Sequence, residues 1–165
     1  MPEPLSPFIV AVVTVSDRVH AGEREDLSGP ILAQAMRDSE AQVVTSVIPD
    51  GIDSVREAIE GAVANGARVV ITTGGTGIGP RDFTPEGTAL VIDRAVPGLA
   101  ERLRAVDADA VPGAVLSRGL AGITSGNPGA LVVNVPGSAS AARSAARILM
   151  SVVPHALAQL AGQDH

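Results

Sequence analysis

The sequence has no cysteine, tryptophan or tyrosine, and its only aromatic residues are Phe8 and Phe83. Without cysteine, disulfides, Cys-ligated metals and thiol chemistry are excluded. All twelve basic residues are arginines, the net charge is −6, and no basic run stands out. We therefore expect no nucleic-acid partner, because phosphate backbones are bound by basic patches. Since aromatics are scarce, the core has to be built from Ala, Val, Leu and Ile.

Long hydrophobic runs are absent as well. No run of about 18 apolar residues is present that could span a membrane. The proline-rich start lacks the basic segment and apolar run of a signal peptide. These absences predict a cytoplasmic protein. With 165 residues, 45% of them hydrophobic, the chain can form one sizeable core. We expect a flexible tail over residues 1–7 and a single domain over residues 8–165.

Apolar runs alternate with amphipathic segments along the chain. The continuous run at residues 8–15 is rich in β-branched residues, which is typical of a strand covered on both faces. Strands are expected at residues 8–15, 42–48, 67–73 and 131–135. Helices are expected at residues 29–38, 52–65, 84–95, 97–106, from 138 onward and at 152–161, with a long loop at 16–28. This alternation predicts an α/β fold, a three-layer α/β/α sandwich with a mostly parallel central sheet.

A glycine-rich segment follows the predicted strand at residues 67–73. Four glycines occur within six residues, flanked by threonines, and Thr84 with Pro85 then marks a helix start. Such a segment exposes main-chain N–H groups that a phosphate can approach closely. One glycine would be explained by a tight turn, but four favour an anion-binding loop. Its predicted members are Thr73, Gly74, Gly75, Thr76 and Gly77.

The glycine-rich segment matches neither of two familiar nucleotide motifs. No Gly-Lys-Ser/Thr follows it, as a P-loop requires, and Pro80 stands where a dinucleotide motif has its third glycine. An ordinary ATPase and a dinucleotide-binding fold are therefore not supported.

Two aspartates, Asp50 and Asp82, lie just past the ends of predicted strands. Taken singly, Asp50 would be a turn residue or helix cap, and Asp82 a surface residue paired with Arg81. The carboxyl ends of parallel strands meet at one edge of a sheet, where ligands bind. Two carboxylates there can hold Mg²⁺, which prefers oxygen ligands and often bridges to phosphates. Together they favour a magnesium site.

Two more polar segments end predicted strands: Ser16, Asp17 and Arg18 after the first, and Pro136, Gly137 and Ser138 after the last. The first could contact a ligand or only form an Asx turn. The second could bind an anion at a helix N-terminus or only cap that helix. Arg118 could meet a phosphate or carboxylate, but a surface charge is the favoured interpretation.

In combination, these blocks resemble the molybdenum-cofactor biosynthesis family, which includes the molybdopterin adenylyltransferases called Mog, their MoaB relatives and the gephyrin G domain. The resemblance covers the chain from about Phe8 to Ala161. Its most specific part is residues 72–77 followed by 80–86. Further blocks occur in the family's order at residues 13–18, 47–50, 96–98, 116–118 and 135–138.

The resemblance implies transfer of AMP from Mg-ATP to the terminal phosphate of molybdopterin, with release of pyrophosphate. It also implies a homo-oligomer, a trimer or a hexamer, that hands its product to a molybdenum-inserting enzyme. Asp50 and Asp82 would be the catalytic carboxylates, acting through Mg²⁺. The glycine-rich loop would hold phosphate, and the segments 16–18 and 136–138 would line the same pocket. Two alternatives remain, a molybdopterin-binding paralogue without transferase activity and a nucleotide pyrophosphatase on a related domain.

Overall fold

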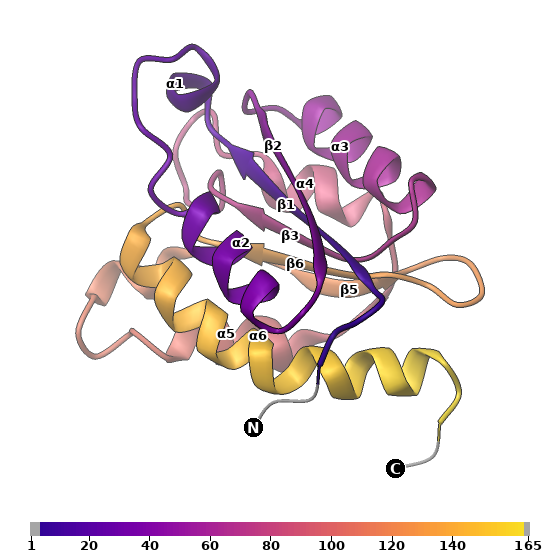
Figure 1. The fold of residues 1–165 in the computed structure, drawn as a ribbon. Coiled ribbons are helices and arrows are strands. Elements are labelled where there is room, and N and C mark those ends of the chain that lie inside the picture. The colour runs from indigo at the N-terminus through magenta and orange to yellow at the C-terminus, as the bar shows by residue number, and fades with distance from the viewer. Residues whose placement is uncertain (1–3, 164–165) are drawn as a thin grey trace.

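A six-stranded sheet of order β2-β1-β3-β6-β5-β4 forms the centre of the computed structural model, which describes residues 4–163 (Figure 1). The strands are β1 (Ile9–Val15), β2 (Gln42–Ile48), β3 (Ala67–Thr73), β4 (Ile92–Ala95), β5 (Ala121–Thr124) and β6 (Leu131–Val135). Strands β2, β1, β3 and β6 are mutually parallel, whereas β5 pairs antiparallel with both β6 and β4. The mostly parallel sheet predicted from the sequence is confirmed.

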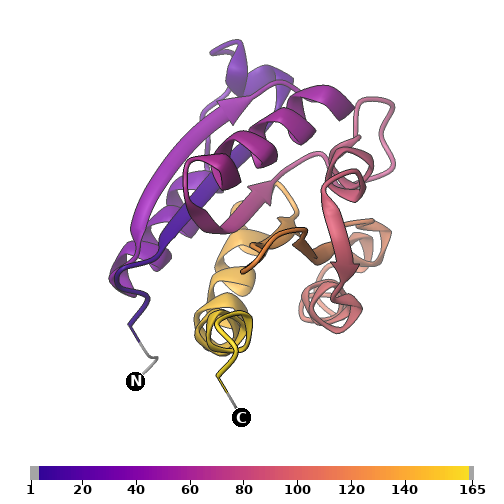
Figure 2. The same cartoon turned by 90° about the vertical axis from the view of Figure 1, so that its right-hand side faces the viewer.

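Helices cover both faces of this sheet. They are α1 (Asp17–His20), α2 (Gly29–Asp38), α3 (Ile52–Ala64), α4 (Thr84–Ala89), α5 (Pro97–Ala105), the 3-10 helix η1 (Pro112–Leu116) and α6 (Ala139–Leu160). Helices α2, α5 and α6 lie over one face, and α3 and α4 over the other (Figures 1 and 2). The three-layer α/β/α architecture is therefore confirmed.

Strand β1 shows why the central strands have continuous apolar sequences. Val10 and Val12 point into the core cluster formed with α2, α5 and α6. Val13 and Val15 point into the second cluster, which is formed with α3. Successive side chains of a strand face opposite sides. A strand buried on both sides is therefore apolar at nearly every position, and the one polar side chain of β1, Thr14, donates its hydroxyl to Asp26.

The predicted helix over residues 84–95 is wrong in its second half. Helix α4 ends at Ala89, and Ile92–Ala95 forms β4, which pairs with β5. Neither of these four-residue strands was predicted. A Cβ atom on Gly122 of β5 would lie 2.4 Å from the Ile92 side chain, so this glycine admits close packing of the partner strand. The pairing is tertiary, and no local pattern indicates it.

Two further boundaries differ from expectation. The helices predicted from residue 138 and at 152–161 are one helix, α6, which contains Pro154. Leu149, Val153 and Leu157 are buried at a spacing of four, so packing on one face spans the proline. The expected loop at 16–28 contains the short helix α1, whose N-cap Ser16 accepts a hydrogen bond from the Val19 N–H.

The predicted flexible tail over residues 1–7 does not hold at Leu5. This side chain is 1% exposed and belongs to the core cluster, and its N–H donates to Ser39 O at 2.6 Å. Residues 1–3 of the predicted tail lie outside the described residues. None of the helices within residues 4–163 is long and apolar enough to cross a membrane.

We expect alanine substitutions at two helical glycines to have opposite effects on the free energy of unfolding. A Cβ at Gly87 of α4 would lie 2.7 Å from Ile52 O and 2.8 Å from Val55 Cβ. Gly87→Ala should therefore destabilise the protein by about 1–3 kcal/mol. A Cβ at Gly61 of α3 meets nothing within 4 Å. Gly61→Ala should stabilise by about 0.4–1 kcal/mol. Urea unfolding measures both, and stabilisation by Gly87→Ala would contradict the packing of α4 on α3.

Candidate active site

The carboxyl ends of the parallel strands meet at one edge of the sheet, around a cleft of about 500 Å³. It is lined by eleven of the predicted site residues: Ser16, Asp50, Thr73, Gly74, Gly75, Thr76, Gly77, Asp82, Pro136, Gly137 and Ser138. Asp17 and Arg18, which were also predicted, do not line it. The convergence follows from the topology, because parallel strands direct their C-terminal loops to the same edge.

The glycine loop, residues 74–79, turns sharply away from the end of β3. Gly74 and Gly75 have φ angles of 103° and 66°, which favour glycine over residues that carry a Cβ atom. A Cβ at Gly74 would lie 2.3 Å from Val15 O, so β1 leaves no room for a side chain. The Thr84 hydroxyl donates to Gly74 O at 2.8 Å and ties the loop to the start of α4.

The glycine loop also makes room for the two predicted carboxylates. A Cβ at Gly75 would lie 3.1 Å from Asp50 Oδ1. Added Cβ atoms at Gly77 and Gly79 would lie 2.9 Å and 2.8 Å from Asp82 Oδ2. That oxygen accepts a hydrogen bond of 2.9 Å from the Gly79 N–H. The missing side chains therefore let both carboxylates lie directly against the loop.

Three consecutive main-chain donors of the glycine loop are free of contacts with the described residues. Within residues 4–163, the N–H groups of Gly75, Thr76 and Gly77 donate to no protein acceptor, whereas the Gly74 N–H donates to Val135 O at 2.9 Å. Consecutive free N–H groups on a loop that lines a cleft are an arrangement that can bind an anion such as phosphate.

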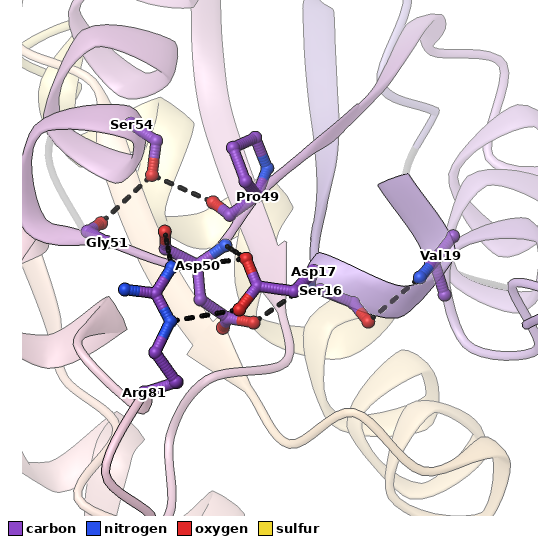
Figure 3. Close-up of polar contacts among 8 residues, drawn as sticks. All are labelled: Ser16, Asp17, Val19, Pro49, Asp50, Gly51, Ser54 and Arg81. Atoms are coloured by element: carbon purple, nitrogen blue, oxygen red, sulfur yellow. Dashed lines mark hydrogen bonds and ion pairs between the residues drawn. The ribbon is translucent and has the colours of Figure 1, made fainter. Parts of the chain in front are cut away.

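Asp17 and Asp50 join the loops that follow β1 and β2 (Figure 3). The Asp17 N–H donates to Asp50 Oδ2 at 2.9 Å, and the Asp50 N–H donates to Asp17 Oδ1 at 3.0 Å. Arg81 donates from Nε to Asp17 Oδ2 at 3.0 Å and from Nη2 to Asp50 O at 2.9 Å. Asp17 thus positions Asp50 from outside the cleft. Arg18 is exposed and also lies outside it.

Negative charge is concentrated around Asp50. Burial raises the pKa of its carboxyl group, and the charges of Asp17 and Asp82 raise it further, although the Asp17 N–H opposes the shift. The hydrogen bond from Arg81 lowers the pKa of Asp17, so this carboxylate stays charged beside Asp50. A bound cation would offset the repulsion among these three aspartates.

The two carboxylates could provide part of the ligand set of a divalent cation, with a bound substrate providing other ligands. Asp50 and Asp82 each engage only Oδ2 in hydrogen bonds to described residues, which leaves both Oδ1 atoms available. The described part of the chain contains no group of three or more His, Cys, Asp or Glu residues that could hold a metal. Mg²⁺ suits this arrangement, because it is usually held by one or two carboxylates together with phosphates and water.

Sequence patterns missed one wall of the cleft, which residues 24–28 form. The Thr14 hydroxyl donates to Asp26 Oδ2 at 2.6 Å, and Ser28 Oγ lies 2.9 Å from Thr73 Oγ1. Arg24 is the one basic side chain that lines the cleft among the described residues. Residues 16–28 were predicted as a long loop in which only residues 16–18 were candidate ligand contacts, and no spacing distinguishes Arg24, Asp26 and Ser28.

The apolar lining of the cleft is aliphatic. Leu27 and Leu116 line it and are 50% and 51% exposed, whereas neither Phe8 nor Phe83 reaches it. A planar ring bound here would therefore contact aliphatic and main-chain atoms.

The favoured interpretation of Arg118 as a surface charge is wrong. Its guanidinium donates to Gly77 O at 2.9 Å, to Asp82 O at 2.7 Å and to the Glu86 carboxylate. The acceptors lie 32 to 41 residues away along the chain, so spacing could not reveal this contact.

Comparison with known proteins agrees with the geometry of the cleft. A family model described as a probable molybdopterin binding domain matches residues 11–155, a span that includes both aspartates and the glycine loop. The chain belongs to this family. The resemblance noted from its sequence blocks is thereby confirmed.

Members of the molybdopterin-binding-domain family match this chain over most of its length. A molybdenum cofactor biosynthesis bifunctional protein of Synechococcus elongatus is 38% identical over 98% of the chain, which spans only 50% of that relative. A molybdopterin adenylyltransferase of Pyrococcus furiosus is 39% identical over 91% of this chain and 89% of its own length. The Mog protein structure from Mycobacterium ulcerans superposes with a TM-score of 0.87 at 38% identity, covering 93% and 99% of the two chains.

We expect Asp17 to make the stability of the protein sensitive to acid. Because its pKa is lower in the folded protein than in the unfolded chain, its contribution is fully present above the unfolded pKa and is lost as the pH falls through the folded pKa. Asp17→Asn should lower the free energy of unfolding at about pH 7, and its difference from wild type should shrink towards about pH 3.

Urea unfolding of wild type and variant at both pH values measures this effect. Asp93→Asn, at an exposed position outside the cleft, is the control and should change little. A difference between Asp17→Asn and wild type that is the same at both pH values would contradict the ion pair with Arg81.

Proposed function

We propose that this protein is a molybdopterin adenylyltransferase, which transfers AMP from ATP to the terminal phosphate of molybdopterin and releases pyrophosphate. One observation carries the proposal: a glycine loop with free main-chain donors and two carboxylates from different strand ends line the same cleft. The 39% sequence identity to the Pyrococcus furiosus molybdopterin adenylyltransferase, over most of both chains, supports the proposal.

In this reaction an oxygen of the pterin's terminal phosphate attacks the α-phosphorus of ATP. The bond from that phosphorus to the bridging oxygen breaks, and pyrophosphate leaves with the electron pair. We infer that the N–H groups of Gly75, Thr76 and Gly77 donate to phosphate oxygens as charge shifts during transfer. Preorganised donors of this kind stabilise the transition state without rearrangement. Arg24, which lines the cleft, would offset part of the phosphate charge.

We infer that Asp50 and Asp82 hold Mg²⁺ that arrives with ATP. When bound, the ion would neutralise phosphate charge and help to orient the nucleotide. The protein's own part is to keep the two carboxylates in place. The Asp17 N–H holds Asp50 Oδ2, and the Gly79 N–H holds Asp82 Oδ2.

Thr73, Pro136, Gly137, Ser138 and Ser16 complete the proposed substrate pocket. Thr73 Oγ1 donates to Pro136 O at 3.0 Å and so joins the ends of β3 and β6. The family resemblance further supports a homo-oligomer, a trimer or hexamer, acting in the cytoplasm and passing its product to a molybdenum-inserting enzyme.

The first test is an adenylyl-transfer assay with purified protein, molybdopterin, ATP and Mg²⁺, in which adenylyl-molybdopterin and pyrophosphate are followed. We expect both products to form in equal amounts. EDTA should stop their formation, because without Mg²⁺ the phosphate charge is not neutralised. Molybdopterin binding without product would favour the paralogue that lacks transferase activity. Nucleotide cleavage that needs no pterin would favour a pyrophosphatase.

Asp82→Asn tests the proposed carboxylate pair. We expect kcat to fall by at least about 100-fold, because the substitution removes charge that matters most in the transition state. Molybdopterin binding should be largely retained. Asp109→Asn, at an exposed position outside the cleft, is the matched control. Full activity of the Asp82→Asn variant would show that the assignment of this residue is wrong.

A further inference from the structure

Arg118 contacts the glycine loop and the segment that follows it at several points. Its main-chain N–H donates to Thr76 O at 2.8 Å. Its guanidinium donates from Nε to Gly77 O at 2.9 Å and from Nη2 to Asp82 O at 2.7 Å. Glu86, in the first turn of α4, accepts from the same guanidinium. The Arg118 side chain therefore holds the segment that carries Asp82 at Gly77, at Asp82 and at Glu86.

These contacts determine which way the peptide groups of the loop face. In a planar trans peptide, the C=O of one residue and the N–H of the next point in opposite directions. Because Arg118 holds the carbonyls of Thr76 and Gly77, the N–H groups of Gly77 and Ile78 must point away from it. Rotation of either peptide would break a hydrogen bond to Arg118. The main-chain N–H of Arg118 therefore stabilises the orientation of the Gly77 N–H, and its guanidinium stabilises that of the Ile78 N–H, so that both remain available as donors.

Arg118 is itself held by a second arginine. Arg104, near the end of α5, donates from Nη1 to Ser117 O at 3.2 Å and to Gly119 O at 2.7 Å. These are the carbonyls of the two residues that flank Arg118. A chain of contacts thus runs from α5 through Arg104 to the segment 117–119, and from Arg118 to the glycine loop. Arg104 itself does not line the cleft that contains Asp50 and Asp82.

We propose that Arg118 is a positioning residue for the anion-binding glycine loop and that Arg104 acts through it. Arg118 sets the orientation of the loop peptides and the place of the Asp82 main chain, without touching substrate. The planar fork of an arginine can bond two carbonyls and a carboxylate at once, which a lysine ammonium cannot reproduce. The inference rests on the proposed function only for the identity of the bound anion.

The test compares Arg118→Gln, Arg118→Lys, Arg104→Gln and the double glutamine variant with Arg56→Gln. Arg56 is a matched control, since its side chain is 36% exposed against 38% for Arg118 and pairs with Asp53 on α3. The first readout is amide hydrogen exchange at residues 74–83 of the ligand-free protein, with α2 as the internal reference. The second is the Kd of Mg-ATP, measured by calorimetry without pterin.

We expect both Arg118 variants to exchange faster at residues 74–83 with α2 unchanged, and Arg118→Gln to bind Mg-ATP about tenfold more weakly than wild type. Arg118→Lys should remain weakened although it keeps the charge. Arg104→Gln should also speed exchange at residues 74–83 and weaken Mg-ATP binding, but by less than Arg118→Gln does. The double variant should match Arg118→Gln, because a residue that acts through another adds nothing once that residue is gone.

Loop exchange and Mg-ATP affinity of Arg118→Gln equal to those of Arg56→Gln would overturn the proposal. Full recovery by Arg118→Lys would reduce the role of Arg118 to charge and would also overturn it. Additive effects in the double variant would show that Arg104 does not act through Arg118. If wild type bound no Mg-ATP, the proposed function would fail, while loop exchange would still decide the positioning role.

Discussion

The contact between the Asp82 carboxylate and the glycine loop is the constraint on which the rest of the site depends. Any side chain at Gly77 or Gly79 would come within 2.9 Å of Asp82 Oδ2, so the loop has to be bare for the carboxylate to sit there. That carboxylate uses the Gly79 N–H and leaves the donors of Gly75, Thr76 and Gly77 free. Donors suited to an anion thus lie beside an acid that would repel one. A cation held by the carboxylate would offset both negative charges, which is why we propose Mg²⁺ together with a phosphate substrate for this cleft.

The fold builds this site from loops that are distant in sequence. Four parallel strands bring residues from Ser16 to Ser138 to one edge of the sheet. The loops are then fastened to each other rather than to the strands alone. Asp17 and Asp50 each donate the main-chain N–H to the carboxylate of the other, and Arg81 bonds to both residues. An exposed ion pair alone contributes little to stability. Here the arginine also bonds a main-chain carbonyl, so its main effect is to restrict how far the two aspartate-bearing loops can separate.

The sequence was most informative where local pattern and tertiary structure agree. The segments predicted at 42–48 and 67–73 are β2 and β3 with the same boundaries, because apolar runs between turn residues need no distant partner to be recognised. Strands β4 and β5 were missed because they depend on each other. Asp17 was predicted in the pocket, but it does not line the cleft, and its carboxylate pairs with Arg81, 64 residues away. The contacts of Arg118 with the glycine loop were also missed, because its acceptors are distant in the sequence. Strand-end positions were thus predictable, whereas contacts between loops were not.

A crystal structure of the protein with Mg²⁺ and a non-cleavable α,β-methylene analogue of ATP tests the central claim most directly. The account predicts a metal ion about 2.0–2.1 Å from oxygen atoms of Asp50 and Asp82. It also predicts phosphate oxygens within about 2.7–3.2 Å of the main-chain nitrogens of Gly75, Thr76 and Gly77. A triphosphate bound away from the glycine loop, or a metal ion held by neither aspartate, would contradict it.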